Sequence, residues 1–483
     1  MKLSTQRTTA LIAIIAAGIA VTGCKRAKAR SDSKAESNET AQEAKVALDG
    51  VTDDSIRVVQ IASFTGAQAG LGTEIYRGAM AYFMEVNAKG GIHGRKIDLV
   101  PLDDKYSAEG GERATERALA EEGGFVMFGA TGTEPMGGIL KALQKNEAKK
   151  AFLWGSTSGA ESSREGPLAQ YAFNLRGSLK GAGRDIIEAY SSSGFKKVGI
   201  VFQDDGFGKS AGAAARKAAE DKGMQVVLEL PIAKTAKPDN TSATDLVTKM
   251  KAAGADSMVL AATYNPASVF ARDAREHGWN APMSVMGTPD TMLRFLVAHE
   301  KKTGKRMTNA ILGCINAPPV NATELPAVRE YRDLMDKRNP QLPAQIADPN
   351  YRPIRYSSSA FEGYIMARVL GEALERNGRN LTRDSLRKAA QSVANWDPGV
   401  GQRVSFGAND NQGFDSIWLA GVKNDEFGLV NDMKKYLTDK PEPVTVAKAG
   451  EDAKDGKGTL TADTKAPGAA LNAKTPPGAP AKK

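Results

Sequence analysis

The chain has 483 residues, of which 41% are hydrophobic and 25% are charged, a balance that is ordinary for a soluble globular protein and excludes wholesale disorder. Two cysteines are too few for a disulfide scaffold or a four-cysteine zinc site, and three histidines far apart in the chain leave little room for histidine-based catalysis or metal binding. The formal net charge of +9 raises the question of whether a basic surface binds nucleic acid or an anionic membrane.

The first 23 residues are typical of an export signal. Lys2 and Arg7 precede the apolar run ALIAIIAAGIAV, which is shorter than the roughly 20 residues that a membrane span needs. The run ends in Val-Thr-Gly-Cys24, which resembles the lipobox of bacterial lipoproteins. This resemblance implies cleavage before Cys24 and a lipid anchor on that residue, where several acyl chains hold a protein more firmly than one. A plain secretory signal with a chance cysteine is the alternative.

The segments that follow the signal and end the chain lack the residues of a core. Residues 24–52 are charged and free of aromatic side chains, and they are predicted to be a disordered tether. Residues 441–483 are rich in Lys, Ala, Gly and Pro and are predicted to be a disordered tail. The remaining residues, 51–440, hold 50 basic and 46 acidic side chains, so their charge is nearly balanced. We therefore do not expect nucleic acid as a partner.

Between residues 53 and 437, short β-branched runs alternate with amphipathic stretches. Residues 56–62 predict a strand, and the next stretch places apolar residues three or four apart from Ile75 to Val86, as on one face of a helix. Further strands are predicted at 96–102, 125–129, 151–155, 197–202, 224–230, 257–261, 283–287 and 310–313. Strands that alternate with helices form parallel sheets covered on both faces, and this many strands exceed one open sheet. We expect an α/β fold of two doubly wound lobes, divided near residues 175–178.

The loops that follow the predicted strands are rich in hydroxyl groups. In doubly wound sheets, ligands bind at the carboxyl ends of the strands. Thr131 and Thr133 flank a predicted helix start, whose free N–H groups and dipole favour an anion such as a carboxylate. Ser156 and Thr157, after the next strand, could donate to the same anion. Simple helix capping by the two threonines is the alternative.

Several motifs in order carry a family resemblance. They are SFTGAQAGLG (63–72), RGA (77–79), NAKGGIHGRK (87–96), LDD (102–104), FGATGT (128–133), DDGFG (204–208) and FEGYIMAR (361–368). Together they resemble the extracytoplasmic substrate-binding proteins of branched-chain and hydrophobic amino-acid ABC transporters, the leucine/isoleucine/valine-binding type. The resemblance covers about residues 53–437.

This resemblance implies the type I periplasmic binding protein fold, in which two lobes joined by a three-crossover hinge close around a ligand. It implies a first lobe at 53–177 and 318–398, and a second lobe at 178–317 and 399–437. It also implies ligand-binding positions in the first lobe, which are Leu71, where some relatives have an aromatic residue, the carboxylate loop Thr131, Gly132 and Thr133, and the second main-chain loop Gly155, Ser156 and Thr157.

The second lobe is implied to supply three further ligand contacts. Phe207 matches the aromatic residue that caps the ligand, and Tyr264 matches a tyrosine that faces the ammonium group or lines the pocket. Asp290 is the nearest match to the acid that pairs with the ammonium group, but it lies one position later than the usual pattern. A ligand that lacks an ammonium group, such as an amide, a urea or an aromatic acid, therefore stays open.

The sequence thus predicts a monomeric, lipid-anchored receptor outside the cytoplasm that presents a small amino-acid-like ligand to an ABC permease. No enzyme, cofactor or metal is expected, because the sequence lacks Walker A, HExxH and CxxC motifs and has no GxGxxG after its first strand. The pairs Asp103-Asp104 and Asp204-Asp205 are interpreted as carboxylates that orient loops. A ligand-sensing subunit for a signalling partner is the alternative function.

Overall fold

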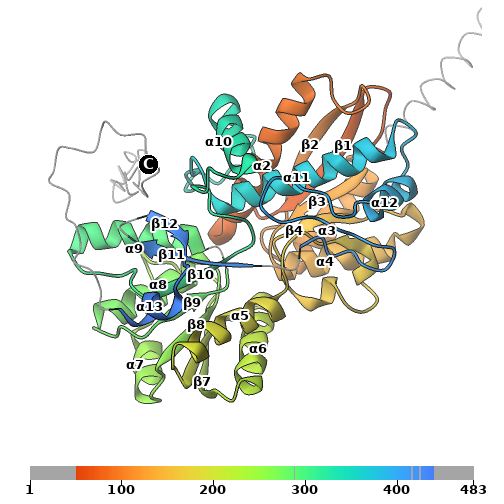
Figure 1. Cartoon of the computed structure of the whole chain (residues 1–483). Coiled ribbons are helices and arrows are strands. Elements are labelled where there is room, and N and C mark those ends of the chain that lie inside the picture. Colours follow the sequence, from red (N-terminus) through yellow and green to blue (C-terminus); the bar gives the residue numbers. More distant parts are fainter. Residues whose placement is uncertain (1–49, 288, 415–416, 424–425, 440–483) are drawn as a thin grey trace, which may run out of the picture. The chain divides into compact units, whose positions relative to one another are not determined.

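The computed structural model describes residues 50–287, 289–414, 417–423 and 426–439 (Figure 1). The predicted signal, Cys24, most of the predicted tether and the predicted tail at 441–483 lie outside the described residues. Residues 50–52, expected in the tether, already belong to the fold, since the Gly50 carbonyl accepts a hydrogen bond from Arg57 N at 2.7 Å and Val51 pairs with Ile56. Within the described residues, no helix combines the length and apolarity that a membrane span requires.

The first sheet has five parallel strands in the order β2-β1-β3-β4-β5. Its strands are β1 (Ser55–Ala62), β2 (Lys96–Asp103), β3 (Val126–Ala130), β4 (Leu153–Ser156) and β5 (Ala172–Phe173). The register pairs Ser55 with Lys96 and runs without a shift to Ala62 and Asp103. The sequence predicted all of these strands except β5, whose two residues are too short for a periodic signal.

The second sheet has seven strands in the order β12-β11-β10-β9-β8-β6-β7. They are β6 (Lys197–Gln203), β7 (Gln225–Ile232), β8 (Ser257–Ala261), β9 (Met283–Val285), β10 (Ile311–Ile315), β11 (Trp418–Lys423) and β12 (Glu426–Leu429). The expected parallel arrangement holds from β6 to β10, but it is wrong for β11 and β12, which pair antiparallel with their neighbours. Only two residues join β11 to β12, and such a short connection can join antiparallel strands but not parallel ones.

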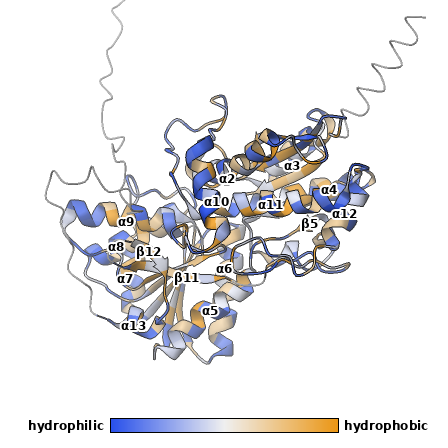
Figure 2. Ribbon diagram, turned by 45° about the horizontal axis from the view of Figure 1, so that its top comes forward, coloured by the Kyte–Doolittle hydropathy of each residue, from blue (hydrophilic) through white to orange (hydrophobic). Residues whose placement is uncertain are grey.

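Helices accompany both sheets (Figure 1). Those that pack around the first sheet are α2 (Ala69–Ala88), α3 (Ala108–Ala120), α4 (Thr133–Lys145), α10 (Pro326–Arg338), α11 (Ser358–Asn377) and α12 (Arg383–Gln391). Those that pack around the second are α5 (Leu179–Ser192), α6 (Gly206–Asp221), α7 (Thr244–Ala252), α8 (Tyr264–Glu276), α9 (Pro289–Thr303) and α13 (Met433–Thr438). Short 3-10 turns are η1 (Gly66–Gln68), η2 (Glu147–Lys149), η3 (Glu161–Ser163) and η4 (Ala169–Tyr171). Helix α10 is largely blue in Figure 2, because it buries only one stripe, on the side that contacts α2.

Side-chain caps define several of the helix starts. Ser107, Ser178, Asp205 and Ser357 each accept a hydrogen bond from the backbone N–H three residues later. Such a cap satisfies one of the N–H groups that have no partner within the helix, and its loss typically costs about 1 kcal/mol.

Helices α2 and α11, which are far apart in the sequence, lie side by side (Figure 1). Glycines permit their close approach, since a Cβ atom on Gly78 would lie 1.6 Å from the Ala360 carbonyl oxygen and one on Gly363 would lie 2.2 Å from that of Ile75. The RGA and FEGY motifs therefore serve helix packing, which brings the late part of the chain onto the first sheet.

The core of the first sheet also takes in residues from near the end of the described chain. Val404, Phe406 and Phe414 are buried in the cluster that contains Trp154 and Phe173, and the Phe406 ring lies 5.8 Å from that of Trp154 and 5.3 Å from that of Phe173. Sequence reasoning expected everything after residue 398 in the second lobe. The lobe boundaries remain a prediction, and this packing moves the last expected crossover to about residue 414.

Candidate functional site

The loops after β1, β3 and β4 meet at the carboxyl edge of the first sheet, because these strands are neighbours. Ser63 N donates to Thr131 Oγ1 at 2.9 Å, and Gly132 N donates to Thr157 Oγ1 at 3.1 Å. Thr157 N in turn donates to the Ala130 carbonyl oxygen at 2.8 Å. We call this group the hydroxyl cluster, and its members are Ser63, Thr131, Thr133, Ser156, Thr157 and Ser158.

Helix α4 begins at this cluster without a side-chain cap. Its N-cap residue is Gly132, with φ of 88°, and neither threonine forms a capping hydrogen bond. A side chain at Gly132 is excluded, since its Cβ atom would lie 2.4 Å from the Tyr106 ring. The alternative interpretation of Thr131 and Thr133 as helix caps is therefore wrong. The uncapped start of α4 can bind an anion through its N–H groups and the helix dipole.

The hydroxyl groups of the cluster differ in what they can do. Thr131 is completely buried and accepts from Ser63 N, so it holds the loops together. Thr133 is only partly buried, and its hydroxyl lies 2.9 Å from that of Ser158. Ser156 is buried beside Met136, and Gly155 has a φ of 71° where a side chain would press on Met366. Thr133 and Thr157 are the least buried members of the hydroxyl cluster.

A buried carboxyl group stands behind the hydroxyl cluster. Asp104 is completely buried, and its Oδ1 accepts from Ser63 Oγ at 2.7 Å and from Tyr106 N at 2.8 Å. Burial raises the pKa of Asp104 to about 7. Its neighbour Asp103 accepts from Phe64 N at 2.9 Å, so this pair orients the loop after β1, as the sequence predicted.

The start of α2 touches the strand ends of the second sheet. Gln68 Nε2 donates to Thr263 Oγ1 at 2.9 Å, and that hydroxyl donates to Gln203 Oε1 at 2.6 Å. The Tyr264 hydroxyl donates to the Ala67 carbonyl oxygen at 3.0 Å, and burial raises the pKa of Tyr264. Loops from both sheets therefore come together at this edge.

The other predicted ligand residues are placed differently. Leu71 is buried in one cluster with Tyr106 of the first lobe and Tyr264 of α8, so it packs where elements of the two sheets meet. Phe207 is buried at the start of α6, in a separate cluster that includes Met136 of α4. It packs as a core residue in this structure.

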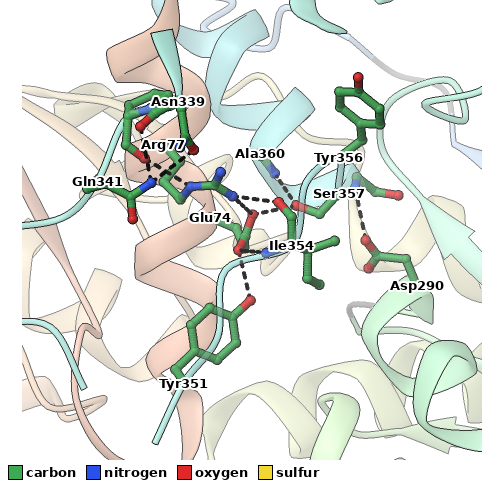
Figure 3. A network of polar contacts seen from close by, with 12 residues as sticks. Glu74, Arg77, Asp290, Asn339, Gln341, Tyr351, Ile354, Tyr356, Ser357 and Ala360 are labelled. Atoms are coloured by element: carbon green, nitrogen blue, oxygen red, sulfur yellow. Dashed lines mark hydrogen bonds and ion pairs between the residues drawn. The ribbon is translucent and has the colours of Figure 1, made fainter. Parts of the chain in front are cut away.

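Asp290 contacts the protein itself. It lies in the first turn of α9, and its Oδ2 accepts from the backbone N–H of Ser358, at the start of α11, at 2.9 Å (Figure 3). Its other oxygen has no hydrogen-bond partner among the described residues. From the same helix, Arg294 donates to the Tyr356 carbonyl oxygen at 2.9 Å. Helix α9 of the second sheet is thus bonded to the segment that begins α11 of the first.

Residues 55–426 match the model of the periplasmic binding protein family. The chain belongs to this family. An amino acid binding protein of Pseudomonas aeruginosa is 26% identical over 222 residues, which are 45% of this chain and 56% of that protein. The Leu/Ile/Val-binding protein homolog 8 of Brucella abortus is 27% identical over 237 residues, 46% of this chain and 55% of that protein. The chain spans about half the length of the curated relatives it matches.

Solved structures of periplasmic binding proteins share the fold. A possible leucine/isoleucine/valine-binding protein from Rhodopirellula baltica has 22% identity and a TM-score of 0.68 over 81% of this chain and 99% of that one. A substrate-binding periplasmic protein from Ralstonia solanacearum has 25% identity and a TM-score of 0.65 over 76% and 97%. A branched-chain amino acid ABC transporter structure from Thermus thermophilus with bound valine has 17% identity and a TM-score of 0.65 over 80% and 99%. The predicted family and its type I fold are confirmed.

Sequence reasoning missed one feature of this fold, the connection between α10 and α11. Nineteen residues, 339–357, separate α10 from α11 and form neither helix nor strand. They are held by Glu74 and Arg77, both buried in α2 (Figure 3). The signal in the sequence was an unusually long connection, together with a glutamate and an arginine one turn apart on a helix that is otherwise largely apolar.

Proposed function

We propose that this protein is a receptor outside the cytoplasm that captures a small carboxylate-bearing molecule between its two lobes and presents it to an ABC permease, without catalysing a reaction. The observation that carries the proposal is the hydroxyl cluster at the uncapped start of α4, beside the contact of α2 with the strand ends of the second sheet. Membership in the periplasmic binding protein family supports the same function.

The chemistry of the hydroxyl cluster favours a carboxylate. A carboxylate at the start of α4 gains hydrogen bonds from backbone N–H groups and from the Thr133 and Thr157 hydroxyls, together with the favourable end of the helix dipole. Hydrogen bonds to a charged group contribute about 1.5–3 kcal/mol each, so the loss of one such bond should lower the affinity about 10- to 150-fold.

The rest of the ligand is proposed from weaker support. Leu71 and Tyr264 offer apolar and aromatic surface, which suits a branched-chain or hydrophobic amino acid or a related amide. The names of the relatives point to amino acids, and one structural neighbour is a fatty acid ABC transporter substrate-binding protein from Thermomonospora curvata. One oxygen of Asp290 accepts from Ser358 N and leaves only the other for an ammonium group, so acids without an ammonium group belong among the candidates as well.

Calorimetric titration of the full chain tests this function. The ligands are hydrophobic amino acids, the matching amides, and straight-chain and aromatic acids without an amino group. We expect saturable one-to-one binding for at least one group and a raised melting temperature in its presence. A protein that binds none of these compounds would contradict the proposal.

We also propose that Cys24 carries a lipid that attaches the receptor to a membrane. Its support is the apolar run followed by Val-Thr-Gly-Cys. The variant Cys24→Ser is expected to move the protein from the membrane fraction to the soluble fraction. The control is Cys314→Ala, which removes the buried cysteine of β10 and should leave the protein in the membrane fraction. Retention of the Cys24→Ser protein on membranes would show that something else attaches it.

A further inference from the structure

The connection between α10 and α11 is fixed against helix α2 by hydrogen bonds. We call residues 339–357 the wall segment. Connections longer than about 12–15 residues without secondary structure are uncommon in compact domains and are usually functional when ordered. A long connection also loses more conformational entropy when it is fixed, so strong contacts must hold it in place.

A buried ion pair of α2 supplies those contacts. Glu74 is 2% exposed and Arg77 is 3% exposed, and Arg77 Nη1 lies 3.3 Å from Glu74 Oε2. The Glu74 carboxylate accepts from the Tyr351 hydroxyl at 3.0 Å, from Ile354 N at 2.9 Å and from Ser357 Oγ at 2.9 Å.

Arg77 binds the same segment at two points. It donates to the carbonyl oxygens of Pro340 at 3.1 Å and Ile354 at 2.5 Å. Because a buried ion pair is costly unless its hydrogen bonds are made, the wall segment and the pair stabilise each other. Figure 3 shows the Tyr351 hydroxyl pointing at Glu74 from the end of this network.

Tyr351 is thereby held against the start of α2. A Cβ atom on Gly70 would lie 2.6 Å from the Tyr351 ring and 3.1 Å from the Tyr264 hydroxyl, so both rings close over this glycine. The wall segment contacts the preceding turn as well, where Gly66 N donates to Asp348 Oδ2 at 2.7 Å.

Hydrogen bonds connect the start of α2, against which the Tyr351 ring packs, to the hydroxyl cluster. Gly72 N donates to the Ser63 carbonyl oxygen at 3.2 Å, and Ser63 bonds to Thr131. Leu71, next to Gly70, is buried in the same cluster as Tyr264. We expect a ligand whose carboxylate binds the hydroxyl cluster to extend along the start of α2 toward the rings of Tyr351 and Tyr264.

We propose that Tyr351 is a specificity-determining residue that closes the end of the ligand cleft and limits the length of the ligand's side chain. This inference rests on the proposed function, because it concerns the ligand of the same site. Removing the ring opens space beyond Gly70, and each further methylene group that becomes buried there raises the affinity about fourfold.

The test measures affinity along a series of straight-chain carboxylates, with and without an α-amino group, from acetate and glycine upward. For the wild-type full chain we expect affinity to rise with length and then to fall sharply. Tyr351→Ala should move the preferred length upward, with a gain of at least tenfold for the first compounds that the wild type rejects. Gly70→Ala should also change the length limit, because the added methyl group would lie 2.6 Å from the Tyr351 ring and has to displace it.

Matched controls separate the effect of the Tyr351 ring on the length limit from its effect on the stability of the wall segment. Tyr351→Phe loses the hydrogen bond to Glu74 but keeps the ring, and it should keep the wild-type length limit. Arg352→Ala changes an exposed neighbour in the same segment and should also keep it. Melting temperatures identify any variant that fails to fold, and Gly70→Ala, which displaces the Tyr351 ring without removing it, is the second variant that tests the inference.

The outcomes distinguish this inference from the proposed function. Binding by the wild type with an upward shift of the preferred length in Tyr351→Ala and a changed length limit in Gly70→Ala supports the inference. Binding by the wild type with the same length limit in both folded variants overturns it and leaves the proposed function standing. A wild-type protein that binds no member of any ligand series overturns both.

Discussion

Replacing Asp290 with asparagine tests whether this carboxylate holds the protein closed or binds the ligand. The sequence resemblance assigned it to the ligand's ammonium group, whereas in the structure its Oδ2 accepts from Ser358 N at 2.9 Å. The contact joins α9 of the second sheet to the start of α11, which packs against α2. Asp290 is 3% exposed, so water screens this contact little.

The size of the effect follows from the hydrogen bond. A bond to a charged acceptor contributes about 1.5–3 kcal/mol and one to a neutral acceptor about 0.5–1.5 kcal/mol. Asparagine keeps the acceptor but loses the charge that faces the start of α11, so we expect a loss of about 1–2 kcal/mol. If the bond exists only in the closed protein, the whole loss appears in the apparent affinity, which falls about 5- to 30-fold for every ligand.

The assay compares two ligands that differ only in the ammonium group. Calorimetry on the wild type and on Asp290→Asn uses a hydrophobic α-amino acid and the same acid without the amino group. The control is Glu220→Gln, which neutralises an exposed carboxylate of α6. We expect Asp290→Asn to weaken both ligands equally. Weakening of the amino acid alone would refute this reasoning and return Asp290 to the ligand site.

Three further predictions concern other parts of the fold. Thr157→Ala should weaken ligand binding by about 1–3 kcal/mol in calorimetry, because a charged partner loses a hydrogen bond, whereas the exposed Thr248→Ala should not change it. Since burial raises the pKa of Asp104 from 3.8 to about 7, the folded state holds this proton more tightly than the unfolded chain, and the resulting stability is lost as the pH rises through about 7. The free energy of unfolding, measured with urea, should fall by up to about 1.4 kcal/mol per pH unit between pH 3.8 and about 7, and Asp104→Asn should reduce this slope. An unchanged slope in Asp104→Asn would contradict the assignment. Gly78→Ala should lower the free energy of unfolding by about 3 kcal/mol, because its Cβ atom would lie 1.6 Å from the Ala360 carbonyl oxygen. Gly137→Ala, whose Cβ atom would have no atom within 4 Å, should stabilise the protein slightly.

The sequence predicted the strands well where local pattern is strong. Buried parallel strands are near-continuous hydrophobic runs, and each of the predicted strands corresponds to one of β1–β4 or β6–β10. The strands that were missed are β5, β11 and β12, of which β5 has only two residues and β12 only four. The antiparallel pairing of β11 and β12 depends on which edge of the second sheet is still unpaired when the chain comes back to that sheet. No local sequence pattern predicts this edge.

The hydroxyl cluster was predictable because topology alone brings strand ends together. Thr131, Gly132 and Thr157 lie in loops that follow neighbouring parallel strands, and they form hydrogen bonds with one another as a result. The partners of Glu74 and Asp290 were not predictable. Tyr351 lies 277 positions from Glu74 and Ser358 lies 68 positions from Asp290, and residues of this type at such separations carry no pattern that links them.

The most direct test of a receptor that closes on its ligand is a distance measurement between the lobes. Spin labels are attached to Glu116→Cys on α3 and Lys249→Cys on α7, both exposed positions, in a Cys24→Ser background. Cys314 does not compete for the label, because it is buried and burial raises the pKa of its thiol to about 12. Saturation with the tightest ligand from the calorimetric panel should narrow the distance distribution to one short component, and Asp290→Asn should reduce that component at subsaturating ligand. A distribution that saturating ligand leaves unchanged would contradict capture by closure.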